Sequence, residues 1–526
     1  MATVINRIKK PVGLIVLDGW GIAPEWGGNA ISQAKTKTFN TILLNYPNTT
    51  LLASGAAVGL PINAPGNSEA GHLNIGAGRV VHQDISIIDS NIESGAFFKN
   101  TVLLSAILHA KKNNSNLHLI GLLSDTGTHS HVRHLYALLR LCKENNFSRV
   151  YIHLFSDGRD SSPMNGIELA NNVFLEIKKI GVGRIASISG RFFAMDRDNR
   201  WGRVSRTYNM LTKGQGNVFP SVMNAFSTAY AQGQSDEFIE PRIISNPTEP
   251  QVNIGNNDAI ISFNFRSDRT KELISAFLSP NIPAFKDRTI LKNIFFVSMA
   301  IYEDLSLAKK AFAPEKVETP LARIIAEANL RQFHIAETEK YPHITYFING
   351  GREAPFQGED RFLIPSPRGV KTYDFAPKMS AELVVAKTLH LLGQNSYDSF
   401  MLNFANADMV GHSGNFQATV HAIECVDSLL SPILNKIISL GGTALIVGDH
   451  GNAEQMVNPR TGEPDTEHTT NPVPFAIVSE NPLIKRLKLQ SDGILASVAP
   501  TMLEIMHTKK PEIMQNQSLI IREING

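Results

Sequence analysis

Short apolar runs that each end in a cluster of polar residues recur along this chain of 526 residues. Val12–Leu17 is one such run, and Leu117–Leu123 and residues 443–447 are others. Continuous apolar runs of this length are typical of strands buried on both faces of a parallel sheet. Stretches with a helical pattern, such as residues 166–179 and 418–440, lie between the runs, which predicts an α/β fold.

The chain is too long for one hydrophobic core, because single cores stop growing beyond about 250–300 residues. Strands in the first part of the chain (residues 1–83) and in the last part (316–526) end in acidic residues, so we expect these parts to form one domain. The loops of residues 84–315 are rich in arginine, and we expect a second α/β domain there, inserted through two linkers. The segment 232–257 cannot be assigned a role from its sequence.

Composition excludes several classes of protein. The hydrophobic share of 43% and the charged share of 19% are those of soluble globular proteins. A net charge of +2 gives no indication of a nucleic acid or an anionic membrane as partner. The two cysteines, Cys142 and Cys425, are far apart in the sequence, which argues against a disulfide framework. With no membrane-spanning run and no signal-peptide cleavage site, we expect a cytoplasmic protein.

One serine, Ser68, stands in a run of small residues, GNSEAGH at 66–72. This composition predicts a tight, exposed turn. A serine hydroxyl is a weak nucleophile unless a base or a metal favours its ionised form. Taken alone, the run is therefore most simply an ordinary surface turn. Ser68 becomes a candidate nucleophile only if acids and histidines elsewhere in the chain form a metal site around it.

Acids and histidines follow the predicted strands of the first domain. The candidate metal ligands are Asp18, Asp408, His412, Asp449, His450 and His468, with Ser68 as a seventh. Strand ends gather ligands in doubly wound sheets, although a single histidine in a loop is more often a polar residue with an ordinary partner. The mixture of carboxylate and imidazole suits Mn²⁺ or Zn²⁺ better than Mg²⁺. Seven ligands are too many for one tetrahedral ion, whereas two ions about 3.5–4 Å apart could share them.

Arginines gather in the loops that follow the strands of the middle segment. They are Arg159, Arg191, Arg197, Arg266 and Arg269. Each one alone would most simply pair with a neighbouring aspartate at the surface. Five at successive strand ends favour a pocket for a small polyanion, because guanidinium groups bind phosphate or carboxylate through two parallel hydrogen bonds. His129 and Asp160 share these loops and are candidates for exchanging protons with hydroxyl groups of the ligand.

With these residues assembled, the chain resembles the cofactor-independent (2,3-bisphosphoglycerate-independent) phosphoglycerate mutases of the alkaline phosphatase superfamily. The resemblance covers essentially the whole chain. Six motifs carry it: LDGWG at 17–21, GNSEAGH at 66–72, SDGRD at 156–160, NFRSDR at 264–269, NADMVGH at 406–412 and GDHGN at 448–452. It implies an alkaline-phosphatase-like, doubly wound domain that binds the metals, and an inserted transferase domain that binds phosphoglycerate.

The resemblance also implies a reaction, the interconversion of 3-phosphoglycerate and 2-phosphoglycerate in glycolysis and gluconeogenesis, through a phosphoserine at Ser68. It implies two divalent ions, with Mn²⁺ expected, and no 2,3-bisphosphoglycerate. One ion would be held by Asp408, His412 and His468, and the other by Asp18, Ser68, Asp449 and His450. The implied substrate contacts are His129, Arg159, Asp160, Arg191, Arg197, Arg266, Arg269 and Lys340.

Lys340 belongs to this set only through the resemblance, because its sequence context reads as an exposed helix end. We expect a monomer that acts on small molecules, with the inserted domain closing over the substrate to exclude water.

Three other functions fit part of the pattern. The chain could be a metal-dependent phosphatase or sulfatase-like hydrolase that uses the same metals and Ser68, a mutase of pentose phosphates, or a catalytically silent anion-binding protein. The arginine-rich segment favours a mutase over a hydrolase, because a mutase must retain its dephosphorylated intermediate.

Overall fold

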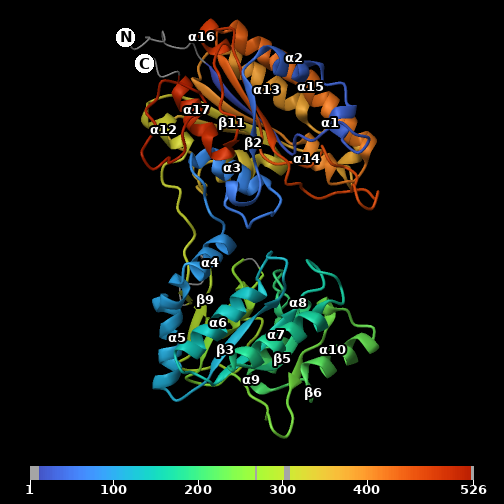
Figure 1. Cartoon of the computed structure of the whole chain (residues 1–526), viewed down its shortest axis with the longest axis vertical. Helices are drawn as coiled ribbons and strands as arrows, with labels where there is room; N and C mark the ends of the chain where they lie inside the picture. The colour runs from blue at the N-terminus through green and yellow to red at the C-terminus, as the bar shows by residue number, and fades with distance from the viewer. Residues whose placement is uncertain (1–10, 267–268, 301–307, 523–526) are drawn as a thin grey trace. The chain divides into compact units, whose positions relative to one another are not determined.

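The computed structural model of the protein describes residues 11–266, 269–300 and 308–522. The chain divides into two compact units (Figure 1), a first unit of Met1–Gln83 with Glu315–Gly526 and a second unit of Asp84–Pro314. Each unit contains one eight-stranded sheet with helices packed against it, which confirms the predicted pair of α/β domains.

The sheet of the first unit has the order β12-β11-β13-β1-β14-β15-β2-β16. Its strands are β1 (Val12–Leu17), β2 (Asn48–Leu52), β11 (Gln332–Glu337), β12 (Glu359–Ile364), β13 (Ser399–Phe404), β14 (Thr443–Gly448), β15 (Val473–Val478) and β16 (Gly493–Ile494). Only β15 runs antiparallel to its neighbours among these described strands. Since β1 is paired in parallel with both β13 and β14, the carboxyl ends of these three central strands lie at one edge.

Helices cover both faces of this sheet. Successive side chains of a strand point to opposite faces. Accordingly, Leu14 and Val16 pack in one hydrophobic cluster with helices that include α3, whereas Ile15 and Leu17 pack in another with helices that include α15. The helices of the first unit are α1 (Ala30–Gln33), α2 (Lys37–Asn45), α3 (Ser68–Ala77), α12 (Leu321–Glu327), α13 (Ala381–Gly393), α14 (Asn406–Gly411), α15 (Phe416–Ser439), α16 (Pro482–Lys485) and α17 (Val498–Ile505), with short helical turns η1 (Gly55–Val58), η4 (Thr338–Lys340), η5 (His343–Phe347), η6 (Tyr373–Phe375) and η7 (Leu495–Ser497).

The sheet of the second unit has the order β10-β9-β8-β3-β4-β5-β7-β6. Its strands are β3 (Leu117–Leu123), β4 (Val150–Ser156), β5 (Arg184–Gly190), β6 (Asn217–Phe219), β7 (Arg242–Ile244), β8 (Ala259–Ser262), β9 (Phe295–Ser298) and β10 (Lys309–Lys310). Its helices are α4 (Asp84–Glu93), α5 (Thr101–Lys112), α6 (Val132–Glu144), α7 (Gly166–Ile180), α8 (Arg191–Ala194), α9 (Trp201–Lys213), α10 (Val222–Ala231) and α11 (Lys271–Leu278), with short turns η2 (Ala96–Lys99) and η3 (Asp236–Phe238).

The segment 232–257, which has no readable pattern, contributes to this second sheet. It contains η3 and β7, and β7 pairs antiparallel with β5. Asp236 is buried, and its carboxylate accepts hydrogen bonds from the Gly166 amide at 2.7 Å and the Tyr230 hydroxyl at 2.6 Å. The segment therefore extends the sheet and fixes the first turn of α7.

The two segments of chain that join the units, around residues 79–83 and 315–316, contact each other within the first unit. Arg79 forms an ion pair with Glu315 and donates a hydrogen bond of 3.1 Å to the carbonyl of Lys316. His82 Nδ1 lies 2.8 Å from Glu315 Oε1. Residues 79–82 and 315–316 therefore run side by side, and the second unit is an insertion at one place in the first.

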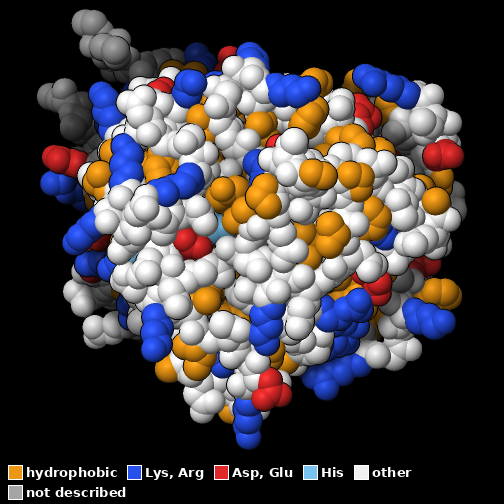
Figure 2. Space-filling model, turned by 90° about the horizontal axis from the view of Figure 1, so that it is seen from below, with side chains coloured by type: hydrophobic (Ala, Val, Ile, Leu, Met, Phe, Trp, Pro, Cys, Tyr) orange, Lys and Arg blue, Asp and Glu red, His pale blue; other side chains and the backbone are white. Residues whose placement is uncertain are grey.

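On the face drawn in Figure 2, hydrophobic side chains form small groups between polar ones, and lysine and arginine side chains are dispersed around them. Within the described residues, no helix combines the length and the hydropathy that crossing a bilayer requires.

Candidate functional site

Ser68 is the first residue of α3 and is 6% exposed, so the prediction of an exposed turn is wrong. Asn67 caps the helix, and its side chain accepts a hydrogen bond from the Ala70 amide at 2.8 Å. The small residues that suggest a turn serve close packing instead. A Cβ atom on Gly71 would lie 2.7 Å from the backbone oxygen of Asp449, so only glycine lets α3 approach that loop.

Three charged or titratable side chains surround the Ser68 hydroxyl. Lys340 Nζ lies 2.6 Å from Ser68 Oγ, His450 Nε2 lies 2.9 Å from it, and Asp18 Oδ1 lies 3.2 Å from it. Asp18 follows β1, His450 follows β14 and Lys340 ends η4, so residues from distant parts of the sequence meet at this edge of the sheet.

The six predicted acid and histidine ligands form two groups within the first unit. Asp408, His412 and His468 make one group, and Asp18, Asp449 and His450 make the other. Within each group, one possible ligand atom from each residue lies within 4.8 Å of the other two.

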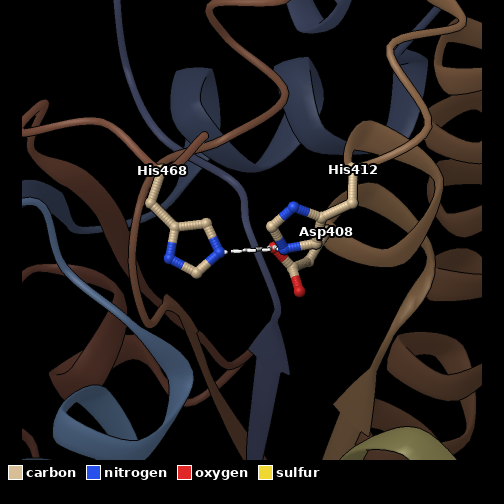
Figure 3. Close-up of side chains that lie close together, drawn as sticks. All are labelled: Asp408, His412 and His468. Carbon is tan, nitrogen blue, oxygen red and sulfur yellow. Dashed lines mark hydrogen bonds and ion pairs between the residues drawn. The ribbon is translucent and has the colours of Figure 1, made fainter. Parts of the chain in front are cut away.

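The first group has its imidazole rings turned toward one carboxylate (Figure 3). The Nε2 atoms of His412 and His468 lie 3.3 and 3.2 Å from Asp408 Oδ1, and 3.0 Å from each other. Each ring has its Nδ1 2.8 Å from a backbone carbonyl, that of Thr466 for His412 and that of Gly66 for His468. Hydrogen bonds to carbonyls place the proton of a neutral ring on Nδ1, so both Nε2 lone pairs point to the same place as the carboxylate.

The second group contains a buried carboxylate oxygen that accepts no hydrogen bond within the described part of the chain. Asp449 Oδ1 accepts hydrogen bonds from the amides of Gly19 and His450, at 3.1 and 3.0 Å. Asp449 Oδ2 is buried and accepts no hydrogen bond from the described residues, although His72 Nδ1 lies 3.3 Å from it. Leaving a buried charged oxygen without a partner costs free energy, which a cation at this place would offset.

Lys340 places its ammonium group between the two groups, 2.6 Å from Asp18 Oδ1 and 2.7 Å from Asp408 Oδ2. Burial lowers the pKa of Lys340, but the carboxylates of Asp18, Asp408 and Asp449 together raise it by more, so it lies above its usual value. Burial raises the pKa of Asp18, but Lys340 and His450 together bring it below its usual value. Burial lowers the pKa of His450, and the three carboxylates raise it to about 10. The site thus holds opposite charges out of water.

The second unit brings four of the five predicted arginines together. Arg159, Arg191, Arg197 and Arg269 line one cavity of about 210 Å³. Arg191 is buried, and its Nη1 atom lies 2.5 Å from Asp157 Oδ1 and 2.6 Å from Asp160 Oδ2.

The remaining members of the predicted anion site adjoin this arrangement. His129 Nε2 lies 3.6 Å from Asp160 Oδ2. Arg266 is exposed and does not line the cavity, but the amide of Phe265, which precedes it, donates a hydrogen bond of 2.9 Å to the carbonyl of His129. Residues 267 and 268 of the same motif lie outside the described residues.

Sequence reasoning missed several neighbours of these sites. Arg200 and Arg203 also line the arginine cavity, and their closeness to Arg197 in the sequence, at the start of α9, was an available signal. The stretch around Lys340 read as exposed, yet Lys340 is 4% exposed. Asn452, in the GDHGN motif, donates a hydrogen bond of 3.0 Å to Asp408 Oδ1.

Comparisons with known proteins agree on one family. The model of the BPG-independent PGAM N-terminus matches residues 88–304. A 2,3-bisphosphoglycerate-independent phosphoglycerate mutase of Clostridium kluyveri is 48% identical, with 97% of this chain and 99% of the relative aligned. One from Clostridioides difficile is 45% identical, with 98% and 99% aligned. The solved structure of Leishmania mexicana phosphoglycerate mutase at low cobalt concentration has a TM-score of 0.71 and 30% identity, covering 99% of both chains.

Proposed function

Because this chain belongs to the 2,3-bisphosphoglycerate-independent phosphoglycerate mutases, which are isomerases, we propose that it interconverts 3-phosphoglycerate and 2-phosphoglycerate through a phosphoserine at Ser68. The reaction serves glycolysis and gluconeogenesis and needs no 2,3-bisphosphoglycerate. One observation carries the proposal: the Ser68 hydroxyl lies within 3.2 Å of Lys340, His450 and Asp18, at the edge where both groups of candidate ligands meet.

The residues around Ser68 suit two divalent metal ions, with Mn²⁺ expected. The converging Nε2 atoms of His412 and His468 and the unpartnered oxygen of Asp449 support this fit. Asp408, His412 and His468 would hold one ion, and Asp18, Ser68, Asp449 and His450 the other. Bound ions would favour the ionised form of the Ser68 hydroxyl and offset the charge of the phosphoryl group.

The protein's own side chains bind the substrate and move its protons. The bond between phosphorus and the O3 oxygen of glycerate breaks as the bond to Ser68 Oγ forms, while Ser68 Oγ loses its proton and O3 gains one. The second half of the reaction reverses these changes at O2. The Lys340 ammonium, 2.6 Å from Ser68 Oγ, stabilises negative charge on the transferring group. The arginines of the second unit hold the carboxylate of the glycerate, which retains the intermediate. His129 and Asp160 exchange the proton of the glycerate hydroxyl.

The test follows phosphate from the substrate to Ser68. With 3-phosphoglycerate and Mn²⁺, the protein should form 2-phosphoglycerate with little free phosphate, and mass spectrometry of quenched enzyme should locate a phosphoryl group on Ser68. Ser68→Ala should abolish transfer and leave substrate binding, measured by calorimetry, largely intact. Ser439→Ala, at the exposed end of α15 in the same unit, should behave as the unaltered protein.

Other outcomes would identify the rival functions. Rapid release of phosphate without 2-phosphoglycerate would favour a hydrolase, and competition by pentose phosphates would favour a pentose-phosphate mutase. Full activity of Ser68→Ala would contradict the phosphoserine.

A further inference from the structure

We propose that His72 and Asn403 are positioning residues that together fix the orientation of Asp18 and Ser68. Neither residue touches the Ser68 hydroxyl, and both are wholly buried. His72 lies one turn after Ser68 on α3, and Asn403 stands on β13 opposite Val16 of the neighbouring strand β1. The inference rests on the proposed function, because it concerns how that site is held in shape.

Asn403 holds one oxygen of Asp18. Its Nδ2 atom donates a hydrogen bond of 2.7 Å to Asp18 Oδ2 and lies 3.0 Å from His72 Nε2. The opposite orientation of the amide would place its oxygen against the carboxylate oxygen, two acceptors face to face, so the amide nitrogen must occupy this position. The two amide hydrogens therefore serve Asp18 and His72.

The position of Asn403 decides which nitrogen of His72 carries the proton. Since His72 Nε2 accepts the amide hydrogen, the neutral ring bears its proton on Nδ1. His72 Nδ1 lies 2.9 Å from the carbonyl oxygen of Ser68 and 3.3 Å from Asp449 Oδ2. Hydrogen bonds thus run in one direction, from Asn403 to His72 and from His72 to the backbone of Ser68, with Asp449 beside the donor.

The two oxygens of the Asp18 carboxylate therefore have different partners. Oδ2 is held by Asn403, which turns Oδ1 toward Ser68 Oγ at 3.2 Å and Lys340 Nζ at 2.6 Å. Without the amide, the carboxylate would be free to rotate away from Ser68. Residues that orient metal ligands in this way typically change metal affinity or activity by about 10–100-fold when replaced.

Two substitutions of His72 separate positioning from mere packing. Asparagine places a donor where Nδ1 stands, whereas glutamine places its amide where Nε2 stands and leaves the Ser68 carbonyl without a donor. We expect His72→Asn to bind Mn²⁺ within a few fold of the unaltered protein. His72→Gln and Asn403→Leu should lose about 10–100-fold in Mn²⁺ affinity by calorimetry and in kcat. The KM for 3-phosphoglycerate should stay unchanged in each, because the arginines are untouched.

A matched control and a spectroscopic measurement complete the test. Thr388→Val removes one buried hydrogen bond of the first unit, to the Val384 carbonyl, and should leave Mn²⁺ affinity unchanged. Nitrogen NMR of metal-free, otherwise unaltered protein should show that the neutral His72 ring is the Nδ1–H tautomer. This measurement needs no variant, so it decides the proposal even if Asn403→Leu fails to fold.

Protonation of His72 on Nε2, or equal Mn²⁺ affinity of His72→Asn and His72→Gln, would overturn the inference. Its failure is distinguishable from that of the proposed function. If Mn²⁺ affinity falls as expected while Ser68 never carries phosphate, the positioning role stands and the phosphoserine fails. If Ser68 carries phosphate while the His72 variants bind Mn²⁺ with equal affinity, the phosphoserine stands and the positioning role fails.

Discussion

Lys340 shows how much one buried side chain can determine at this site. Its ammonium group contacts Ser68, Asp18 and Asp408 at once, so it supplies positive charge inside a cluster of carboxylates. Sequence reasoning found the acids and histidines because all of them except His468 follow a strand-like run. Lys340 came only from the family resemblance, since nothing in the local pattern shows that the short turn η4 folds back into the core.

Replacing Lys340 by methionine should destabilise the metal-free protein. Removing one partner of a buried ion pair typically costs about 3–5 kcal/mol, because the remaining charges are left in the interior without a counterion. Urea unfolding followed by tryptophan fluorescence measures this loss, and added Mn²⁺ should recover part of it. Lys378→Met, which removes an exposed pair with Glu382, is the control and should leave stability unchanged. Equal stability of the two variants would contradict the role assigned to Lys340.

Arg266→Lys should weaken substrate binding, because lysine cannot form the two parallel hydrogen bonds of a guanidinium. Losing one charge-assisted hydrogen bond of about 1.5 kcal/mol corresponds to roughly a tenfold rise in KM for 3-phosphoglycerate. Steady-state kinetics measure the change. Arg140→Lys, on the exposed side of α6, keeps a pair with Glu176 and should leave KM unaltered. An unchanged KM and kcat in Arg266→Lys would remove Arg266 from the proposed substrate contacts.

Strands and long helices were easier to predict than the short elements that carry the site. β1 and β3 have the bounds that their apolar runs suggest, because burial on both faces leaves an unbroken run in the sequence. The start of α3 differs from the predicted turn, because glycine, serine and asparagine favour turns but also allow close packing of a helix end. Only the approach of Asp449 to Gly71 distinguishes these two uses.

The end of β11 provides a test of stability against pH. Burial raises the pKa of Glu337 to about 7, although the amide of Ser380 donates a hydrogen bond to it and lowers the pKa in part. A carboxyl group whose pKa is raised by folding contributes stability below its unfolded pKa, and this contribution is lost as pH rises through the folded pKa. A shift of this size corresponds to roughly 3 kcal/mol.

Glu337→Gln should therefore be more stable than the unaltered protein at pH 8, by up to about 3 kcal/mol, and the difference should shrink by pH 5. Urea unfolding at the two pH values measures both quantities. Glu327→Gln, at the exposed end of α12, should show no such pH dependence. A Glu337→Gln difference that is the same at both pH values would contradict the assignment.

Two separate cores make the molecule an assembly of two units rather than one. Each unit has its own sheet and its own hydrophobic clusters, which the length of the chain and its repeated strand pattern indicated. Both sites follow from the same rule, since parallel strands deliver their carboxyl ends to one edge. The rule does not specify which loops meet. Only the structure shows that four of the five arginines line one cavity and that Arg266 does not.

Mn²⁺ should stabilise the first unit alone, since both groups of candidate ligands belong to it. A ligand at 100 times its Kd adds about 2.7 kcal/mol to the state that binds it. Trp20 and Trp26 belong to the first unit and Trp201 to the second. The variant Trp201→Phe therefore keeps only the tryptophans of the first unit, and the double variant Trp20→Phe/Trp26→Phe keeps only that of the second. Thermal unfolding with Mn²⁺ should raise Tm only for the reporters of the first unit. A rise for Trp201 would show that the ions bind elsewhere or that the units unfold together.

The ion pair of Arg79 with Glu315 has a consequence for how such a chain can be rebuilt. Since the outgoing and returning passages adjoin, residues 84–314 can be excised and the cut ends spliced with a short peptide. The spliced protein would keep every strand of the first unit's sheet and all seven candidate ligands in their order. Because its two ends lie close together, the excised piece can also be inserted into a loop of another protein.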